Sequence, residues 1–229
     1  MEVINITKAD LTETNSRLRG YESKLYIYGD NLIKIFFDDS KIENKISKLK
    51  LLSEKNMGMI KPLDFVAYEG EIIGYTMPYL KNYYPIDPFL LNRKNKKEIL
   101  RKLKSKIDEL HQEGIIYGDF NNSNLLINDN LDLELCDFDN VAIGGYDTDL
   151  KSSISERYIK KFGLDETYDE YMYNLYCVCL LDNIHPELVL DYIMHEIHYF
   201  KRNNKEYLEL VKNYVKLQDK NNFKPLRRL

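Results

Sequence analysis

A polar loop that leads into a short β-hairpin constrains this chain more than any other feature. The segment Leu110-His-Gln-Glu-Gly-Ile-Ile-Tyr-Gly-Asp-Phe-Asn-Asn-Ser-Asn124 runs from a helix into a loop. Residues 125–136 then read as an apolar stretch, a turn and a second apolar stretch, which predicts a hairpin. A hairpin brings the loop before it and the loop after it together. We therefore expect Asp119 and Asn124 on one side to lie near Asp137 on the other.

These three residue types suit one kind of chemistry. A carboxylate and an amide oxygen are hard oxygen ligands, and Mg²⁺ that carries substrate phosphates needs only one or two carboxylates from the protein. A further acid that does not bind the metal can orient or deprotonate an attacking hydroxyl. The other interpretation is that Asp119, Asn124 and Asp137 are turn formers and a strand-end acid. Their spacing and the apolar residues around them favour the site.

The first 80 residues read mostly as strands. Residues 25–28 and 32–37 predict two strands around a tight turn, and residues 65–79 predict a second hairpin with its turn at Glu69-Gly70. Between them, residues 39–54 carry apolar side chains at helical spacing, which predicts an amphipathic helix.

The composition changes after residue 80. Residues 82–92 hold two prolines and are predicted to be a connector with a short helical piece. Helices are predicted at 94–113, with Ile99, Leu103, Ile107 and Leu110 on one face, and then at 168–181, 186–200 and 205–217. The chain is therefore expected to have an α+β fold, with a β-rich N-terminal lobe over residues 1–80 and an α-helical C-terminal lobe over residues 81–229.

The loop motif resembles that of the protein kinase-like phosphotransferase superfamily. Tyr-Gly-Asp119, Asn124 and Asp-Phe-Asp139 match H-[R/G]-D-x-x-x-x-N followed by D-F-[G/D], with the spacing typical of the family. The resemblance implies a two-lobed kinase-like fold that binds ATP and Mg²⁺. It also implies that Asp119 is the catalytic base or orienter, and that Asn124 and Asp137 hold the metal.

Other residues follow in the family's order. Lys34, in an apolar strand, is similar to the lysine that pairs with the nucleotide phosphates, and Glu43 to its ion-pair partner on the next helix. An alignment shifted by two residues would put Lys45 in place of Glu43. An exposed edge lysine is the other interpretation of Lys34, but its apolar neighbours favour a buried charge that needs partners.

Residues 75–80, Tyr-Thr-Met-Pro-Tyr-Leu, are similar to the hinge where adenine binds to backbone atoms. With Met77 as the gatekeeper, Pro78 would contribute a carbonyl and Leu80 an N–H. Proline lacks an N–H but keeps its carbonyl, so Pro78 is compatible with this role.

The chain also departs from the family's pattern. The glycine-rich phosphate loop is absent and only Gly20 remains, so Ser23 is the candidate for contacting the phosphates. Gly118 stands where an arginine normally receives a phosphorylated activation segment. We therefore expect activity that does not depend on phosphorylation between Val141 and Tyr168.

The predicted function is transfer of the γ-phosphoryl group of Mg-ATP to a hydroxyl of a protein Ser/Thr or of a small molecule. Two alternatives remain open. The missing glycine loop favours a pseudokinase that acts as a binding module, although the complete Asp119, Asn124 and Asp137 set opposes it. Nucleotidyl transfer on the same fold would need the same residues.

Composition limits the partners and the compartment. The formal net charge of −4 argues against nucleic acid as a partner. No apolar run approaches the ~20 residues that cross a bilayer, so no membrane partner is expected. The 3 cysteines fit reduced thiols in a cytoplasmic protein, with Cys177 and Cys179 in a core helix. The cation-rich residues 93–106 are interpreted as a solvated helix face, with a dock for an acidic or nucleic-acid partner as the alternative.

Overall fold

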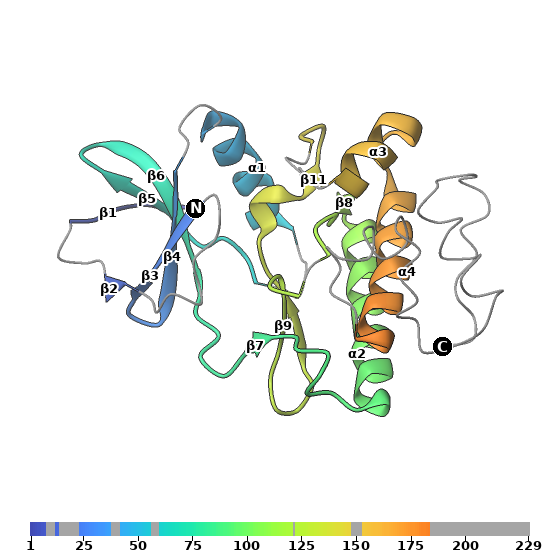
Figure 1. The fold of residues 1–229 in the computed structure, drawn as a ribbon. Coiled ribbons are helices and arrows are strands. Elements are labelled where there is room, and N and C mark those ends of the chain that lie inside the picture. Colours follow the sequence, from blue (N-terminus) through green and yellow to red (C-terminus); the bar gives the residue numbers. More distant parts are fainter. Residues whose placement is uncertain are drawn as a thin grey trace. The chain divides into compact units, whose positions relative to one another are not determined.

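The computed structural model divides into two compact units (Figure 1). The first contains Met1–Asn82 and Ile143–Tyr146, and the second contains Tyr83–Ala142 and Asp147–Leu229. The structure describes residues 1–7, 12–13, 23–37, 42–55, 60–120, 122–147 and 153–183.

The first unit is built on a six-stranded sheet in the order β1-β5-β6-β4-β3-β2. Strand β1 pairs with β5 in parallel, and the other pairs are antiparallel. The strands are β1 (Val3–Asn5), β2 (Thr12–Glu13), β3 (Ser23–Tyr28), β4 (Asn31–Phe36), β5 (Phe65–Tyr68) and β6 (Glu71–Pro78), and the helix α1 (Ile42–Glu54) lies between β4 and β5 in sequence.

Strand β4 lies inside this sheet, between β3 and β6. Neighbouring side chains of a strand point to opposite faces, so one face receives Ile33 and the other receives Lys34 and Phe36. Ile33 packs in an apolar cluster with Ile6 and Val66. Phe36 contacts the ring of Tyr75 and the ammonium group of Lys45 on α1. Lys34 therefore lies on the face that α1 covers.

The second unit contains helices and short sheets. Strands β7 (Tyr84–Pro85), β9 (Leu125–Ile127) and β10 (Leu133–Leu135) form one sheet. Strand β8 (Ile115–Ile116) pairs with β11 (Ala142–Ile143), of which Ile143 is counted with the first unit. The helices are α2 (Arg93–Gln112), the 3₁₀ helix η4 (Phe138–Asn140), α3 (Ser153–Phe162) and α4 (Glu166–Asp182).

Helix α2 begins and ends where its sequence predicts. The Asn92 side chain accepts a hydrogen bond from the Asn95 N–H at 2.9 Å and so caps the first turn. Gly114, just past the last turn, has the left-handed φ of +71° that suits glycine. The predicted apolar face is confirmed, because Ile99, Leu103, Ile107 and Leu110 are all fully buried.

Most predicted elements in the described residues are confirmed, and two expectations change. No helix forms in residues 82–92; instead Tyr84 and Pro85 pair with β9, and the Ile86 N–H donates to Leu125 O at 3.1 Å. Residues 141–168 also contain α3, which the sequence did not predict. The helices predicted at 186–200 and 205–217 lie outside the described residues. No helix in the described part of the chain is long and apolar enough to cross a membrane.

Gly74 allows β6 to approach β4 closely. A Cβ atom added there would lie 2.0 Å from the backbone oxygen of Lys34. We expect Gly74→Ala to lower the free energy of unfolding by about 2–4 kcal/mol, because the clash is with backbone that has no rotamer to change. The control is Gly29→Asn, at a left-handed turn position with open space around it, which should cost less than about 1 kcal/mol. Equal losses in urea unfolding would contradict this account of β4 and β6.

Candidate active site

A buried tyrosine joins the polar loop to the end of the hairpin. Tyr117 is fully buried, and its hydroxyl donates to the carbonyl oxygens of Cys136 at 2.8 Å and Asn124 at 3.3 Å. The Cys136 N–H donates to the same Asn124 oxygen at 3.0 Å. Burial raises the pKa of Tyr117 well above its usual range, so the phenol keeps the proton that it donates. The loop before the hairpin and the strand after it are therefore held together, as the sequence predicts.

Asp119 and Asn124 contact each other directly. The Asn124 Nδ2 atom donates to Asp119 Oδ2 at 2.7 Å and lies 3.4 Å from the Asp119 carbonyl oxygen. Asn124 is buried. Because Nδ2 serves as the donor to Asp119, Oδ1 is the amide atom with the chemistry of a magnesium ligand.

Asp137 follows Cys136 directly, so its backbone lies next to the residue that is bonded to Asn124. Asp137 has φ 69° and ψ 49°, in the left-handed region that residues other than glycine rarely adopt. Non-glycine residues held in this region cluster at functional sites. The next acid, Asp139, is buried within η4.

The donor chemistry fits Mg²⁺ bound together with phosphates. Among the described residues, no group of three or more His, Cys, Asp or Glu side chains gathers into a metal site of its own. Mg²⁺ that carries a nucleotide does not need such a group, since one or two protein ligands, waters and phosphate oxygens complete its octahedron. Asn124 and Asp137 would supply one amide oxygen and one carboxylate.

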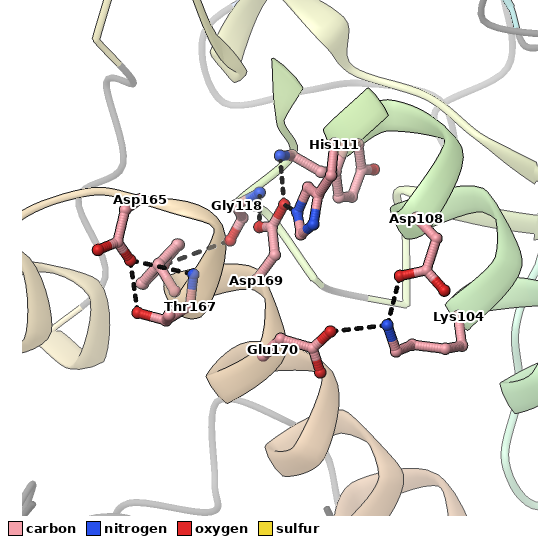
Figure 2. A network of polar contacts seen from close by, with 10 residues as sticks. Lys104, Asp108, His111, Gly118, Asp165, Thr167, Asp169 and Glu170 are labelled. Carbon is pink, nitrogen blue, oxygen red and sulfur yellow. Dashed lines mark hydrogen bonds and ion pairs between the residues drawn. The ribbon is translucent and has the colours of Figure 1, made fainter. Parts of the chain in front are cut away.

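Asp169, to which the sequence analysis gave no role, holds the loop before Asp119 in place. The carboxylate of Asp169, near the start of α4, is fully buried. Its Oδ1 accepts from the Gly118 N–H at 2.7 Å (Figure 2). Its Oδ2 accepts from the Tyr117 N–H at 2.8 Å. His111 Nε2 lies 2.9 Å from the same Oδ2. The sequence signal that could have predicted this role is an acid within an apolar, tyrosine-rich helix, because a buried charge needs partners.

The first unit contributes two buried polar residues. Lys34, on β4, has a relative exposure of 7%, and Ser23, the first residue of β3, is also buried. The exposed edge lysine is therefore excluded as an interpretation of Lys34. Gly20 and the loop around it lie outside the described residues.

Glu43 does not lie where the predicted ion pair would need it. The buried positions of α1 are Lys45, Lys48, Leu49 and Leu52, which form one helical stripe. Glu43 is exposed in the first turn, on the opposite side of the helix from this stripe. The structure thus gives no support to Glu43 as the partner of Lys34. The two-residue shift left open by the sequence matches the burial, since Lys45 occupies the inward position.

The predicted hinge residues lie at the end of β6. Tyr75 and Thr76 are buried, whereas Met77, Pro78 and Leu80 are only partly buried. The N–H of Tyr79, between Pro78 and Leu80, donates to Asp30 O at 3.1 Å and fixes the chain as it leaves the sheet.

Comparisons with known proteins point to kinases. No family model matches the chain. Mitogen-activated protein kinase HOG1 of Candida albicans is 30% identical over 112 residues, which cover 49% of this chain and 28% of that protein. HOG1 of Arthrobotrys oligospora is 30% identical over 117 residues, covering 49% and 30%. The match thus spans less than a third of each relative.

A solved structure supplies the fold. The kinase PK-1 of Cydia pomonella granulovirus aligns with a TM-score of 0.63 and 16% identity, covering 92% of this chain and 89% of that one. This chain has a protein kinase-like fold. The α+β, two-lobed class predicted from the sequence is confirmed, and so is the resemblance to the protein kinase-like superfamily.

Several cations of the basic helix α2 are paired within the chain. On α2, Lys104 lies 2.7 Å from Glu170, and Lys106 lies 3.2 Å from Glu134. Lys102 donates to the Leu131 carbonyl oxygen at 2.7 Å. These contacts take up cations that a nucleic-acid partner would need, so they weaken the docking interpretation of residues 93–106.

The contact between His111 and Asp169 predicts a dependence of stability on pH. Burial lowers the pKa of His111, but the hydrogen bond and charge of Asp169 outweigh it, so the net pKa is raised. A raised folded-state pKa stabilises the protein fully below the unfolded value of about 6.5, and this contribution is lost as pH rises through the folded-state pKa. We expect the free energy of unfolding of the wild type, relative to His111→Gln, to fall as the pH rises above about 6.5.

Urea unfolding at several pH values measures this difference. Glutamine keeps a donor for Asp169 but does not titrate, and the remaining histidines are present in both proteins, so their contribution cancels. Parallel pH profiles for the two proteins would show that the His111–Asp169 ion pair does not form.

Proposed function

We propose that this chain is a phosphotransferase that uses ATP and Mg²⁺ to move the γ-phosphoryl group to a hydroxyl. The acceptor is a protein Ser/Thr or a small molecule. The observation that carries the proposal is the bond from Asn124 Nδ2 to Asp119 Oδ2 at 2.7 Å, on a hairpin whose end leads directly into Asp137. This bond places Asp119, the proposed base for the acceptor hydroxyl, next to Asn124, the proposed metal ligand.

The roles in the second unit follow from this contact. Asp119 accepts the proton of the acceptor hydroxyl, or orients that hydroxyl, while its other hydrogen bond to Asn124 fixes the carboxylate. Asn124 Oδ1 and the Asp137 carboxylate would hold Mg²⁺. When bound, the metal neutralises charge on the phosphates. Phosphoryl transfer asks little covalent chemistry of the protein, so positioning and charge neutralisation supply most of the catalysis.

The first unit would bind the nucleotide itself. Lys34 is proposed to pair with the phosphates, and Ser23 to contact them in place of a glycine-rich loop. At the end of β6, Met77 is the proposed gatekeeper, with the Pro78 carbonyl and the Leu80 N–H as the adenine contacts. Glu43 is left out of this site because it is exposed on the outward side of α1.

The buried cysteines support a reducing compartment. Cys177 and Cys179 lie within α4 and are buried. Burial raises the pKa of the Cys177 thiol to about 12, so it stays protonated and unreactive at neutral pH. We propose a cytoplasmic location on this basis.

A pseudokinase is the second candidate function. Two observations favour it: the glycine-rich loop is absent from the sequence, and Glu43 does not face inward. In this case the chain would bind a nucleotide or a partner without transferring a phosphoryl group.

Substitution of Asp119 and Asp137 separates these functions. We expect Asp119→Asn to lower the turnover number at least about 100-fold while the affinity for Mg-ATP stays unchanged, because Asp119 faces the acceptor and not the metal. Asp137→Asn should instead weaken ATP binding in the presence of Mg²⁺, since a neutral amide replaces a charged ligand. ATP turnover and calorimetric titration of ATP with and without Mg²⁺ measure the two effects.

Asp129→Asn serves as the control for both variants. Asp129 is an exposed acid in the turn of the same hairpin, and it bonds to the Tyr84 hydroxyl at 2.9 Å. Its loss should leave turnover and affinity unchanged. Binding of ATP with no turnover in the wild type would support the pseudokinase, whereas loss of ATP affinity in a folded Asp119→Asn would overturn the assigned roles.

A further inference from the structure

We propose that Tyr168 is a positioning residue that fixes the direction of Asp119 by acting through Gly118. The inference rests on the proposed function, because it assigns a permanent internal support to the same catalytic loop. This support acts on the backbone of Gly118, the residue directly before Asp119.

Both polar backbone atoms of Gly118 are bonded to consecutive residues of α4. The Tyr168 hydroxyl donates to the Gly118 carbonyl oxygen at 3.3 Å. Asp169 Oδ1 accepts from the Gly118 N–H at 2.7 Å (Figure 2). All three residues are in the second unit, and Tyr168 and Asp169 are fully buried. Because water does not compete at these buried sites, both bonds restrain Gly118, the 2.7 Å bond to Asp169 more tightly than the longer bond from Tyr168.

The restraint on Gly118 passes to Asp119 through a shared peptide group. The Gly118 carbonyl and the Asp119 N–H belong to one planar unit, so the orientation of one sets that of the other. The Asp119 N–H donates to the Tyr117 carbonyl oxygen at 2.9 Å, which holds the second end of this unit. Gly118 has φ +76°, a left-handed conformation that glycine adopts without the strain a side chain would add. The direction in which the Asp119 carboxylate leaves the backbone is thereby fixed.

Tyr168 is itself held rigidly. Its ring makes an edge contact with Tyr158 of α3, with the centroids 5.2 Å apart. Tyr158 is fully buried, and its hydroxyl lies 2.9 Å from Thr167 Oγ1. Thr167 is bonded in turn to Asp165, whose side chain accepts from the Thr167 N–H at 3.0 Å and caps α4 (Figure 2). Tyr168 therefore lies in the capped first turn of α4, which fixes the position of its hydroxyl.

This arrangement supplies a physical reason for activity without phosphorylation. A phosphate acts on a catalytic loop by forming charge-assisted bonds with a cation. Here the Tyr168 hydroxyl and the Asp169 carboxylate bond directly to the backbone of Gly118, so the loop is held without a phosphate. Tyr158 and Tyr168 are also fully buried, so a modifying kinase cannot reach these two hydroxyls in the folded protein.

The test compares Tyr168→Phe with Tyr173→Phe. Each variant removes one hydroxyl of α4 that donates to a backbone carbonyl, and the Tyr173 hydroxyl donates to Leu100 O at 3.1 Å, on α2. We expect Tyr168→Phe to lower kcat about fivefold with an unchanged KM for ATP, since only the positioning of Asp119 is lost. Tyr173→Phe should keep the wild-type kcat while losing a similar amount of thermal stability.

Backbone hydrogen exchange gives a readout that does not need activity. The amide of Asp119 should exchange faster in Tyr168→Phe than in the wild type or Tyr173→Phe, because the other end of its peptide group is released. Equal exchange at Asp119 in all three proteins would overturn the inference even if kcat falls. If the wild type shows no transfer, the proposed function fails, and the exchange at Asp119 still decides whether Tyr168 fixes the loop.

Discussion

The buried carboxylate of Asp169 is the interaction on which the candidate active site depends. It accepts the backbone N–H groups of Tyr117 and Gly118 and lies within hydrogen-bond distance of His111. A buried carboxylate without partners is costly, so helix α4 and the loop stabilise each other only in this arrangement. Tyr117 also connects this loop to the hairpin, because its hydroxyl bonds to the carbonyl oxygens of Asn124 and Cys136. One carboxylate thus positions the residues on both sides of Asp119.

The candidate site has a fixed backbone more than a large set of reactive groups. Asp119 is restrained through its own peptide group and through the side chain of Asn124. Asp137 adopts a left-handed conformation at the end of a hairpin strand. Such restraint suits phosphoryl transfer, in which the gain comes from alignment of the acceptor and neutralisation of charge. The tyrosines of α3 and α4 add rigidity from within the chain, without any modification.

The sequence predicted the elements whose signals are local. The apolar face of α2 and the two hairpins of the first 80 residues follow from periodicity and turn residues, and the convergence of Asn124 with the end of the hairpin follows from strand pairing. The sequence left the choice between Glu43 and Lys45 open because a helix face rotates by about 100° per residue, so a shift of two positions exchanges the inward side for the outward side. Asp169 had no assigned role because its partners are backbone N–H groups distant in sequence. Strand β7 consists of only Tyr84 and Pro85, which is too short for any periodic signal.

Parallel incubation of the protein with Mg²⁺ and ATP labelled at either the α- or the γ-phosphate tests the central claim most directly. The account predicts that only the γ-label reaches an acceptor, either the protein itself or an added hydroxyl compound, and that Asp119→Asn abolishes this transfer. Transfer of the α-label would instead show nucleotidyl transfer on the same fold. Binding of ATP with no transfer of either label would contradict the enzymatic account and leave a kinase-like binding module.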